Sequence, residues 1–421
     1  MSRARMMMVA AVLLATAGGA AAEPIAIVGA KVHVRPGQVI DGATVIVDGG
    51  KVTAVGAGIA APAGAKVIDG AGKVVTAGFI EALSGVGMVG VDLESSSVDG
   101  RFGAIDPVHA DAVHAAYQSQ DGFDPHSVAV PVARSGGVTL VVAAPQGGLV
   151  AGQSAAYALD GGATPVRAPA AMYAQLGPGG AGAAGGSRGR AIALLREVLD
   201  DARAYGRDRA AYERNQRRHM IADRLDLEAL QPVLRGAVPL VVTAHSEADV
   251  RAAVRLAQEL RLKLVIAGGA EAWRAADLLA RAKVPVIVDP TANLPEQLDA
   301  TDVRDDGVAI LARAGVPVAV STLGSASAAR TIRQLAGVAV GDGLPWEQAL
   351  AALTTVPAAI HGLTGRGTVE KGAIADLVVW SGDPLELTTA AEAVIIGGVV
   401  QPSDSHQTRL LDRYRKLPMA R

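Results

Sequence analysis

Short runs in which apolar and polar residues alternate lie near both ends of the chain. The clearest is at 44–55, where two alternating runs flank Asp48-Gly49-Gly50. Glycine supplies the positive φ that a tight turn needs, so this stretch predicts a β-hairpin. Similar runs occur at 375–380 and 393–400. Because neither end alone makes an adequate sheet, we expect residues 23–75 and 369–402 to form one small β-sandwich domain.

The pattern changes between these ends. Nearly continuous apolar runs at 239–244, 263–267, 285–289 and 317–321 are typical of strands buried on both faces of a parallel sheet. Helical periodicity separates them, as at 247–262, where the apolar residues fall on one helix face. Repeated strand–helix units predict an α/β fold, most simply a (β/α)8 TIM-like barrel over 76–368. An open doubly wound sheet is the alternative.

Two further segments stand out. The stretch 177–189 is rich in glycine, contains a proline and follows no recognisable strand, so we expect a flexible loop rather than a nucleotide-binding turn. After Pro402, the residues Leu410, Leu411, Tyr414 and Leu417 recur at helical spacing. They predict a helical C-terminal tail at 403–421, packed on the body or on another subunit.

Composition and charge exclude several classes of protein. With 50% hydrophobic and 19% charged residues, the chain is too apolar to be disordered. The 39 basic residues nearly balance the 41 acidic ones, which leaves no broad electrostatic surface for nucleic acid. The absence of cysteine excludes disulfides, thiolate catalysis and cysteine-ligated metal clusters.

The first residues are typical of an export signal. Arg3 and Arg5 precede an apolar run over 6–15, and Ala20-Ala21-Ala22 stands before Glu23. A charged start, a short apolar run and small residues at a cleavage site describe a secretory signal peptide, here at 1–22. The run is shorter than the roughly 20 apolar residues of a membrane anchor. We therefore expect a periplasmic or secreted protein without a membrane span after cleavage.

Motifs spaced along most of the chain then carry a family resemblance. They are Val75-Thr76-Ala77-Gly78-Phe79-Ile80-Glu81, Ala151-Gly152-Gln153-Ser154-Ala155, Leu353-Thr354-Thr355-Val356-Pro357-Ala358 and Lys371-Gly372-Ala373-Ile374-Ala375-Asp376-Leu377. In this order they resemble the metal-dependent amidohydrolase superfamily, especially its imidazolonepropionase-related branch. The resemblance runs from about Pro24 to about Gln401, and it too implies a barrel with a β-sandwich split between the chain ends.

The resemblance also implies one or two divalent metals at the carboxyl-terminal mouth of the barrel. In such enzymes the metal activates water and polarises the scissile carbonyl. The two histidine positions of the first strand correspond to Leu83 and Gly85 here, the strand-six histidine to Gly268, and the strand-eight aspartate falls at about Leu323. Only the strand-five histidine has a counterpart, His245. Most metal-ligand positions are thus replaced.

Other residues offer a rebuilt site as an alternative. None of the eight histidines is separated from another by a single residue, and no His-Glu-X-X-His occurs. A metal or catalytic site could still combine His245 and Asp289 with Glu271, and with Asp92 or Glu94, at strand ends. A serine nucleophile at Ser84 or Ser321 lacks the Gly-X-Ser-X-Gly elbow.

Two functions follow from these observations. The main hypothesis is an exported amidohydrolase-like pseudoenzyme with no cofactor, acting as a binding or partner subunit. Its partner would be an active amidohydrolase paralogue, a second copy of itself or a small molecule, and we expect no nucleic acid. The alternative is an active hydrolase of C–N bonds in cyclic or peptide-like amides, which would need Zn, Fe or Mn.

The signal peptide gives a direct prediction. Cleavage after Ala22 would leave a mature chain that begins at Glu23. Intact-mass spectrometry of the periplasmic or secreted protein should therefore lack the mass of residues 1–22. A soluble cytoplasmic protein that retains Met1 would contradict the expectation of export.

Overall fold

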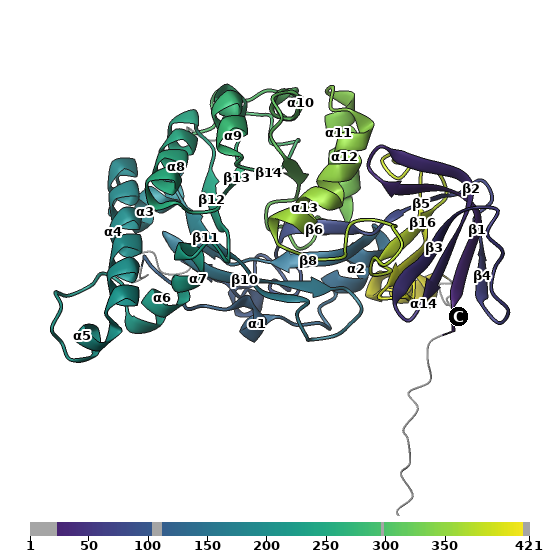
Figure 1. Ribbon diagram of the computed structural model, residues 1–421, viewed down its shortest axis with the longest axis horizontal. Helices are drawn as coiled ribbons and strands as arrows, with labels where there is room; N and C mark the ends of the chain where they lie inside the picture. The colour runs from purple at the N-terminus through teal and green to yellow at the C-terminus, as the bar shows by residue number, and fades with distance from the viewer. Residues whose placement is uncertain (1–22, 103–111, 296–298, 416–421) are drawn as a thin grey trace, which may run out of the picture.

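Two sheets of eight strands each organise the chain. The computed structural model describes residues 23–102, 112–295 and 299–415. The expected signal peptide at 1–22 and the last residues of the tail, 416–421, lie outside the described residues. Figure 1 shows the first sheet beside the second, with the N-terminal strands in purple next to C-terminal strands in yellow.

The first sheet joins the two ends of the chain. Its order is β18-β17-β16-β5-β1-β2-β3, and β4 also pairs with β1. The antiparallel pairing of β16 with β5 joins the C-terminal strands to the N-terminal ones, which confirms the predicted split domain. The strands are β1 (Ile25–Arg35), β2 (Gln38–Asp48), β3 (Lys51–Ala57), β4 (Lys66–Asp69), β5 (Val74–Ala77), β16 (Leu377–Trp380), β17 (Ala391–Ile396) and β18 (Val399–Val400).

Two glycine turns meet in this sheet. The predicted hairpin between β2 and β3 turns at Gly49 and Gly50, whose φ angles are +56° and +77°. The turn between β17 and β18 uses Gly397 and Gly398, and a Cβ placed on Gly398 would lie 2.7 Å from the Gly50 Cα. Only glycine allows both the positive φ and this close approach of the two backbones.

The second sheet forms the barrel, in the order β15-β14-β13-β12-β11-β10-β8-β6. All neighbouring pairs are parallel except those of β10, which runs antiparallel to β8 and β11. Only a short turn separates β8 from β10, and such a connection cannot return the chain for a parallel strand. The barrel strands are β6 (Phe79–Ser84), β8 (Val138–Ala143), β10 (Val150–Ala158), β11 (Arg167–Gln175), β12 (Leu240–Ala244), β13 (Leu264–Gly268), β14 (Val286–Val288) and β15 (Val318–Val320).

The predicted α/β barrel is therefore confirmed. It differs from a strict (β/α)8 barrel in one antiparallel strand, β10. Four of its strands, β12 to β15, coincide with the apolar runs seen in the sequence. A separate two-stranded sheet, β7 (Arg101–Phe102) with β9 (Gln146–Gly147), lies outside the barrel order.

Helices cover the outside of the barrel. The helix predicted at 247–262 is α8, and its N-cap Ser246 accepts a hydrogen bond from the Asp249 N–H. The helices are α1 (Ser119–Gly122), α2 (Ala129–Ser135), α3 (Gly177–Ala183), α4 (Arg188–Arg207), α5 (Arg209–Glu213), α6 (Arg224–Ala229), α7 (Gln231–Leu234), α8 (Glu247–Leu260), α9 (Ala276–Ala282), α10 (Gly307–Arg313), α11 (Ile332–Gly341), α12 (Trp346–Leu353), α13 (Thr355–Ile360) and α14 (His406–Tyr414), with 3-10 turns at Ser95–Ser97, Ala272–Ala275 and Ala329–Thr331.

The glycine-rich segment is not a flexible loop, so that expectation is wrong. It follows a regular strand, β11, and most of it forms the short helix α3 and the start of α4. Gly180 is required there, because a Cβ at this position would lie 2.1 Å from the Gln175 carbonyl oxygen. The glycines thus allow a tight strand-to-helix turn.

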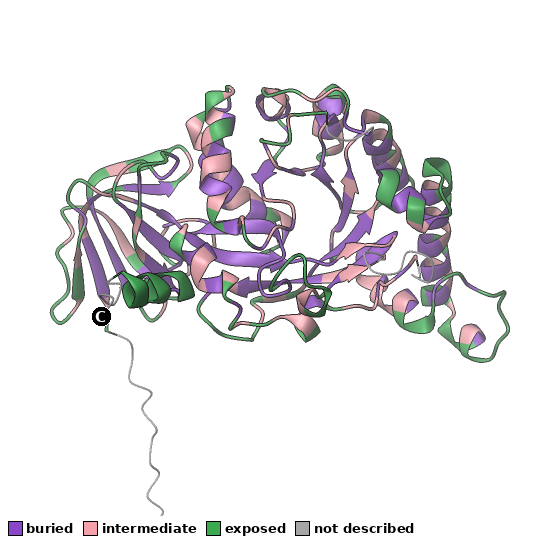
Figure 2. Ribbon diagram, turned by 180° about the vertical axis from the view of Figure 1, so that it is seen from behind, coloured by how far each residue is buried: buried purple, intermediate pink, exposed green. Residues whose placement is uncertain are grey.

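The strands of both sheets are largely buried, whereas the outer helix faces are exposed (Figure 2). None of the residues of α14 is buried, and Leu411 and Tyr414 are 62% and 58% exposed. Among the described residues, no helix combines the length and apolar character needed to cross a bilayer.

Trp380 fixes the terminal sheet to the barrel. Its fully buried indole stacks on Phe79, the first residue of β6, with 5.1 Å between ring centroids. The indole N–H donates to the Thr76 hydroxyl oxygen at 2.9 Å. Gly137 leaves room for the ring, since a Cβ there would lie 2.2 Å from it. A side chain of the terminal sheet therefore belongs to the apolar core of the barrel.

Removing this indole should weaken both domains together. We expect Trp380→Ala to lower the free energy of unfolding by about 3–5 kcal/mol, the usual cost of emptying such a site. Thermal unfolding followed by circular dichroism measures this loss. Trp273→Ala, on a half-buried tryptophan of the barrel surface, is the control and should cost clearly less. A Trp380→Ala protein in which the barrel unfolds as in the parent would contradict the shared core.

Candidate functional site

A cavity of about 150 Å³ lies at the carboxyl-terminal mouth of the barrel. Barrel enzymes carry their active sites at this face. Its polar side chains are amides, hydroxyls and one imidazole, and no carboxylate or cation of the described residues lines it. The lining residues are Leu83, Pro145, Gln146, Gly147, Ala151, Tyr173, Ala174, Gln175, Thr243, His245, Ala267, Gly268 and Leu323.

Three of the four replaced ligand positions line this cavity, namely Leu83, Gly268 and Leu323. Leu83 is 3% exposed and packs with the small apolar side chains inside the barrel. Gly85, the fourth position, lies against the Gly324 carbonyl oxygen, which would be 2.5 Å from a Cβ on Gly85. At these four positions the chain thus presents apolar side chains or bare backbone rather than imidazole or carboxylate groups.

The backbone has a positive φ at two of these positions. Gly268 has a φ of +85°, and a Cβ there would lie 2.5 Å from Cε1 of His245. Leu323 has a φ of +50°, a conformation that side-chain-bearing residues seldom adopt. Histidine at 85 or 268 would therefore clash, so single substitutions cannot simply restore the ligands.

His245 follows β12 and is half-buried at the cavity wall. Its ring makes no hydrogen bond or ion pair with any residue within 23–102, 112–295 and 299–415. Near it, the Gln146 amide donates to the Leu323 carbonyl oxygen at 3.2 Å. The buried Tyr173 hydroxyl has no partner of good geometry in the described chain. Burial, with the nearby Glu81, raises the pKa of Tyr173, so this hydroxyl stays neutral.

The structure does not gather the other proposed ligands around His245. Asp289 lines a neighbouring cavity with Trp273 and Arg304, and it accepts hydrogen bonds from the Thr291 N–H and hydroxyl at 2.8 and 2.6 Å. Asp92 pairs with Arg101 at 2.8 Å. Glu94 accepts from the Ser96 N–H at 3.2 Å and caps a 3-10 turn. Each of these carboxylates has a local structural partner.

Glu271 is likewise used for structure. It accepts hydrogen bonds from the backbone N–H groups of Glu247, Thr301 and Asp302, each at 3.0 Å. Burial raises its pKa, but these three donors outweigh burial and hold the pKa of Glu271 below its ordinary value. Its oxygens are therefore already committed.

The donor set of the mouth does not fit a divalent metal. In the part of the chain that the structure describes, no three histidine, aspartate or glutamate side chains converge on one point. Stable sites for these ions use three or four such ligands. His245 alone offers a single nitrogen.

Sequence reasoning missed the most unusual charged group of the barrel, Glu81. This residue lies in the first strand, β6, and is fully buried. Its carboxyl contacts the Ser321 hydroxyl just after the last strand, β15, and accepts from the Thr322 N–H at 3.3 Å. A lone acidic residue within the apolar run Phe79-Ile80-Glu81-Ala82-Leu83 was the available signal.

These contacts join two strands that share no ladder. In the described chain β6 pairs only with β8, and β15 only with β14. The Gly324 N–H donates to the Leu83 carbonyl oxygen at 2.9 Å, and the Ser321 hydroxyl lies 3.1 Å from the same oxygen. We call this junction, formed by Glu81, Leu83, Ser321, Thr322 and Gly324, the barrel seam.

Hydrogen counting indicates that Glu81 is protonated in the seam. The Ser321 hydroxyl has one hydrogen but two neighbouring acceptors, the Glu81 carboxyl and the Leu83 carbonyl. If Glu81 carries a proton, it donates to Ser321, and Ser321 donates to Leu83. Burial raises the pKa of Glu81 from 4.5 to about 7, against the hydrogen bonds that lower it.

This raised pKa predicts a loss of stability as the pH rises. The stabilisation is complete below pH 4.5 and disappears as the pH passes about 7, an effect of about 3 kcal/mol. Glu81→Gln keeps a neutral donor, so its melting temperature should fall less between pH 5 and 8 than that of the parent. Glu386→Gln, at an exposed glutamate, should keep the parent's pH dependence. Identical pH profiles for Glu81→Gln and the parent would refute a buried proton.

Comparisons with known proteins agree with this architecture. The sequence profile described as "Amidohydrolase family" matches residues 312–401. Amidohydrolase tasK of Hapsidospora irregularis is 44% identical over 63 residues, which are 15% of this chain and only 6% of that protein. The chain therefore spans a small part of the length of this relative.

Solved structures cover almost the whole chain. The amidohydrolase from Thermotoga maritima MSB8 superposes with a TM-score of 0.80 at 29% identity, covering 89% of this chain and 99% of the other. Atrazine chlorohydrolase TrzN from Arthrobacter aurescens TC1, solved in complex with zinc, gives a TM-score of 0.52 at 16% identity over 92% and 98% of the two chains. In profile, local sequence and fold, the chain is similar to proteins of the amidohydrolase superfamily.

Proposed function

We propose that this protein is a pseudoenzyme of the amidohydrolase superfamily that binds a small uncharged molecule at the barrel mouth. The observation that carries the proposal is the replacement of four ligand positions by Leu83, Gly85, Gly268 and Leu323, three of them at the cavity wall. Hydrolysis of an amide needs an activated water and a group that stabilises the developing negative charge. The mouth offers neither among the described residues.

The groups that remain are suited to binding. His245 offers a nitrogen donor and acceptor, and Gln146, Gln175 and Thr243 line the same small cavity. Since no charged carboxylate or cation among the described residues lines the cavity, a charged ligand would lose its hydration without compensation from them. The complementary ligand is therefore small, neutral and polar, such as an amide or a lactam.

Glu81 does not supply the missing base. Its carboxyl lies in the barrel seam, below the mouth residue Leu83, and its contacts are with Ser321 and Thr322. Its oxygens are thus held within the protein. A general base must reach the water that it activates.

We extend the proposal to the cellular compartment and the partner of the protein. An exported pseudoenzyme would work beside an active relative or as an assembly of its own copies. Copurification from the periplasm with a chain that contains an intact His-X-His motif supports the first arrangement.

The pseudoenzyme proposal predicts indifference to chelators. Prolonged dialysis against EDTA should leave the melting temperature unchanged, and elemental analysis should find well below one equivalent of Zn, Fe or Mn. A tight metal would contribute about 4 kcal/mol at a thousandfold excess over its Kd, which shifts the melting temperature by several degrees. A clear drop on chelation, absent in His245→Ala, would instead reveal a metal site at the mouth.

A further inference from the structure

A second, larger cavity lies at the other end of the barrel from the mouth. It has a volume of about 790 Å³, within the range of small-molecule sites. Pro239, Lys263, Pro285 and Pro317 stand just before β12, β13, β14 and β15 and line it, which places it at the amino-terminal ends of these strands. We call it the basal cavity.

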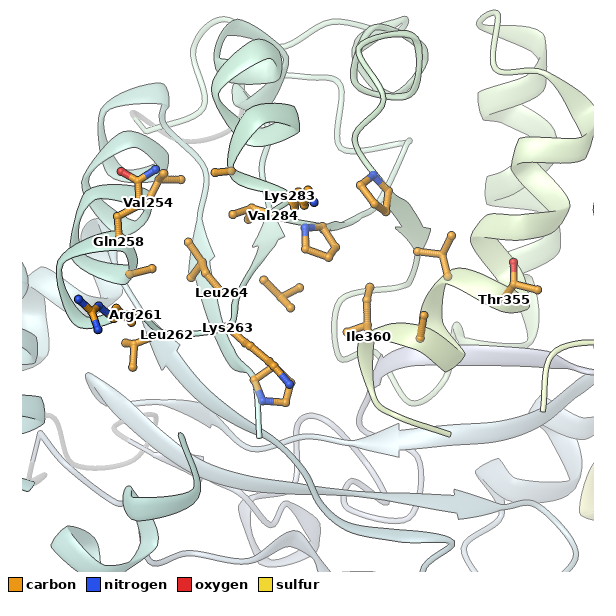
Figure 3. Close-up of a pocket in the computed structure, with 18 residues that line it drawn as sticks. Val254, Gln258, Arg261, Leu262, Lys263, Leu264, Lys283, Val284, Thr355 and Ile360 are labelled. Atoms are coloured by element: carbon orange, nitrogen blue, oxygen red, sulfur yellow. The ribbon is translucent and has the colours of Figure 1, made fainter. Parts of the chain in front are cut away.

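Apolar side chains form its walls. Figure 3 shows Val254 and Gln258 of α8 on one side of the space and Thr355 and Ile360 of α13 on the other. Leu264, the first residue of β13, lies between them, and the next residue, Val265, also lines the cavity. Val265 is 3% exposed and belongs to the apolar cluster inside the barrel. The cavity thus reaches from the surface to the barrel interior.

All charged side chains that line this cavity are basic. Arg261, Lys263 and Lys283 line it, together with no aspartate or glutamate. Their exposed side chains make no ion pair or hydrogen bond with any described residue. By contrast, Arg196 pairs with Glu259 at 2.9 Å and Arg274 pairs with Glu247 at 3.0 Å. Three uncompensated cations at an apolar opening attract an anion.

The two lysines stand at the entries of neighbouring strands. Lys263 precedes β13 directly and Lys283 lies shortly before β14, and Figure 3 shows them at separate places along the cavity. Lys283 is the C-cap of α9, in the left-handed conformation with a φ of +54°. Glycine is the usual residue there, so a lysine is held at this position against its backbone preference.

We propose that the basal cavity binds an aliphatic carboxylate, with its chain inside and its headgroup at the opening. The aliphatic chain would pack against Val254, Val265 and Ile360, and the carboxylate would accept a hydrogen bond from a lysine at the opening, Lys263 or Lys283. Barrel enzymes carry out chemistry at the opposite face, so the ligand is bound and not transformed. The inference does not depend on the pseudoenzyme proposal.

Three ligands that share a ten-carbon alkyl chain but differ in headgroup charge test whether the cavity prefers an anion. Isothermal titration of the mature protein with decanoate, decanol and decyltrimethylammonium, each below its micelle concentration, should show binding of decanoate at least about tenfold tighter than decanol. The cationic ligand should not bind. Equal affinities for decanoate and decanol, or no binding of decanoate, would overturn the proposal.

Variants then test whether decanoate binds in the basal cavity. Ala359 is exposed on α13 and lines the cavity, so Ala359→Trp should fill it and abolish decanoate binding. Ala210→Trp, at an exposed alanine of α5, is the matched control and should bind as the parent does. Because a filled cavity can also perturb folding, Lys263→Met with Lys283→Met gives a second test and should weaken decanoate about tenfold without affecting decanol. Unchanged decanoate binding in both variants, or a dimer that Ala359→Trp dissociates, would refute the site.

Discussion

The barrel depends on a buried carboxyl at the one place where its strands do not pair. Between β6 and β15 no ladder joins the first strand to the last, and Glu81 contacts Ser321 and Thr322 across this gap. A neutral carboxyl can both donate and accept, so it replaces part of the missing ladder at low desolvation cost. The seam also sets the position of Leu83 and Leu323, which narrow the mouth.

Much of the fold could be predicted from the sequence, because burial on two faces leaves a simple signal. The apolar runs before Ala244, Gly268, Asp289 and Ser321 became strands, and the hairpin at Gly49 and Gly50 formed as expected. The antiparallel β10 was not foreseen, since strand direction depends on the length of a connection rather than on apolar pattern. The glycines after Gln175 were misread because composition alone does not separate a loop from a tight strand-to-helix turn.

The sequence indicated which residues stand at the ligand positions of the family, but not how the backbone and side chains are arranged there. Family motifs located Leu83, Gly85, Gly268 and Leu323, and three of these positions do line the mouth. The sequence could not indicate that His245 lies against Gly268, because a positive φ is a property of the backbone. Asp289 and Glu271 were plausible ligands by position along the chain, yet local hydrogen bonds occupy both.

The sharing of one sheet between the chain ends has a consequence for synthesis and transport. As the chain emerges from its N-terminus, β1 to β5 form first, and β5 keeps an unpaired edge until residues 377–380 arrive. An exposed strand edge is a site for pairing with other chains. The stretch between, almost the whole barrel, must therefore be made, and moved through any translocation channel, before that edge is covered. The pairing of β16 with β5 is thus a contact of very long sequence separation, the kind that generally forms slowly and leaves strand edges exposed meanwhile.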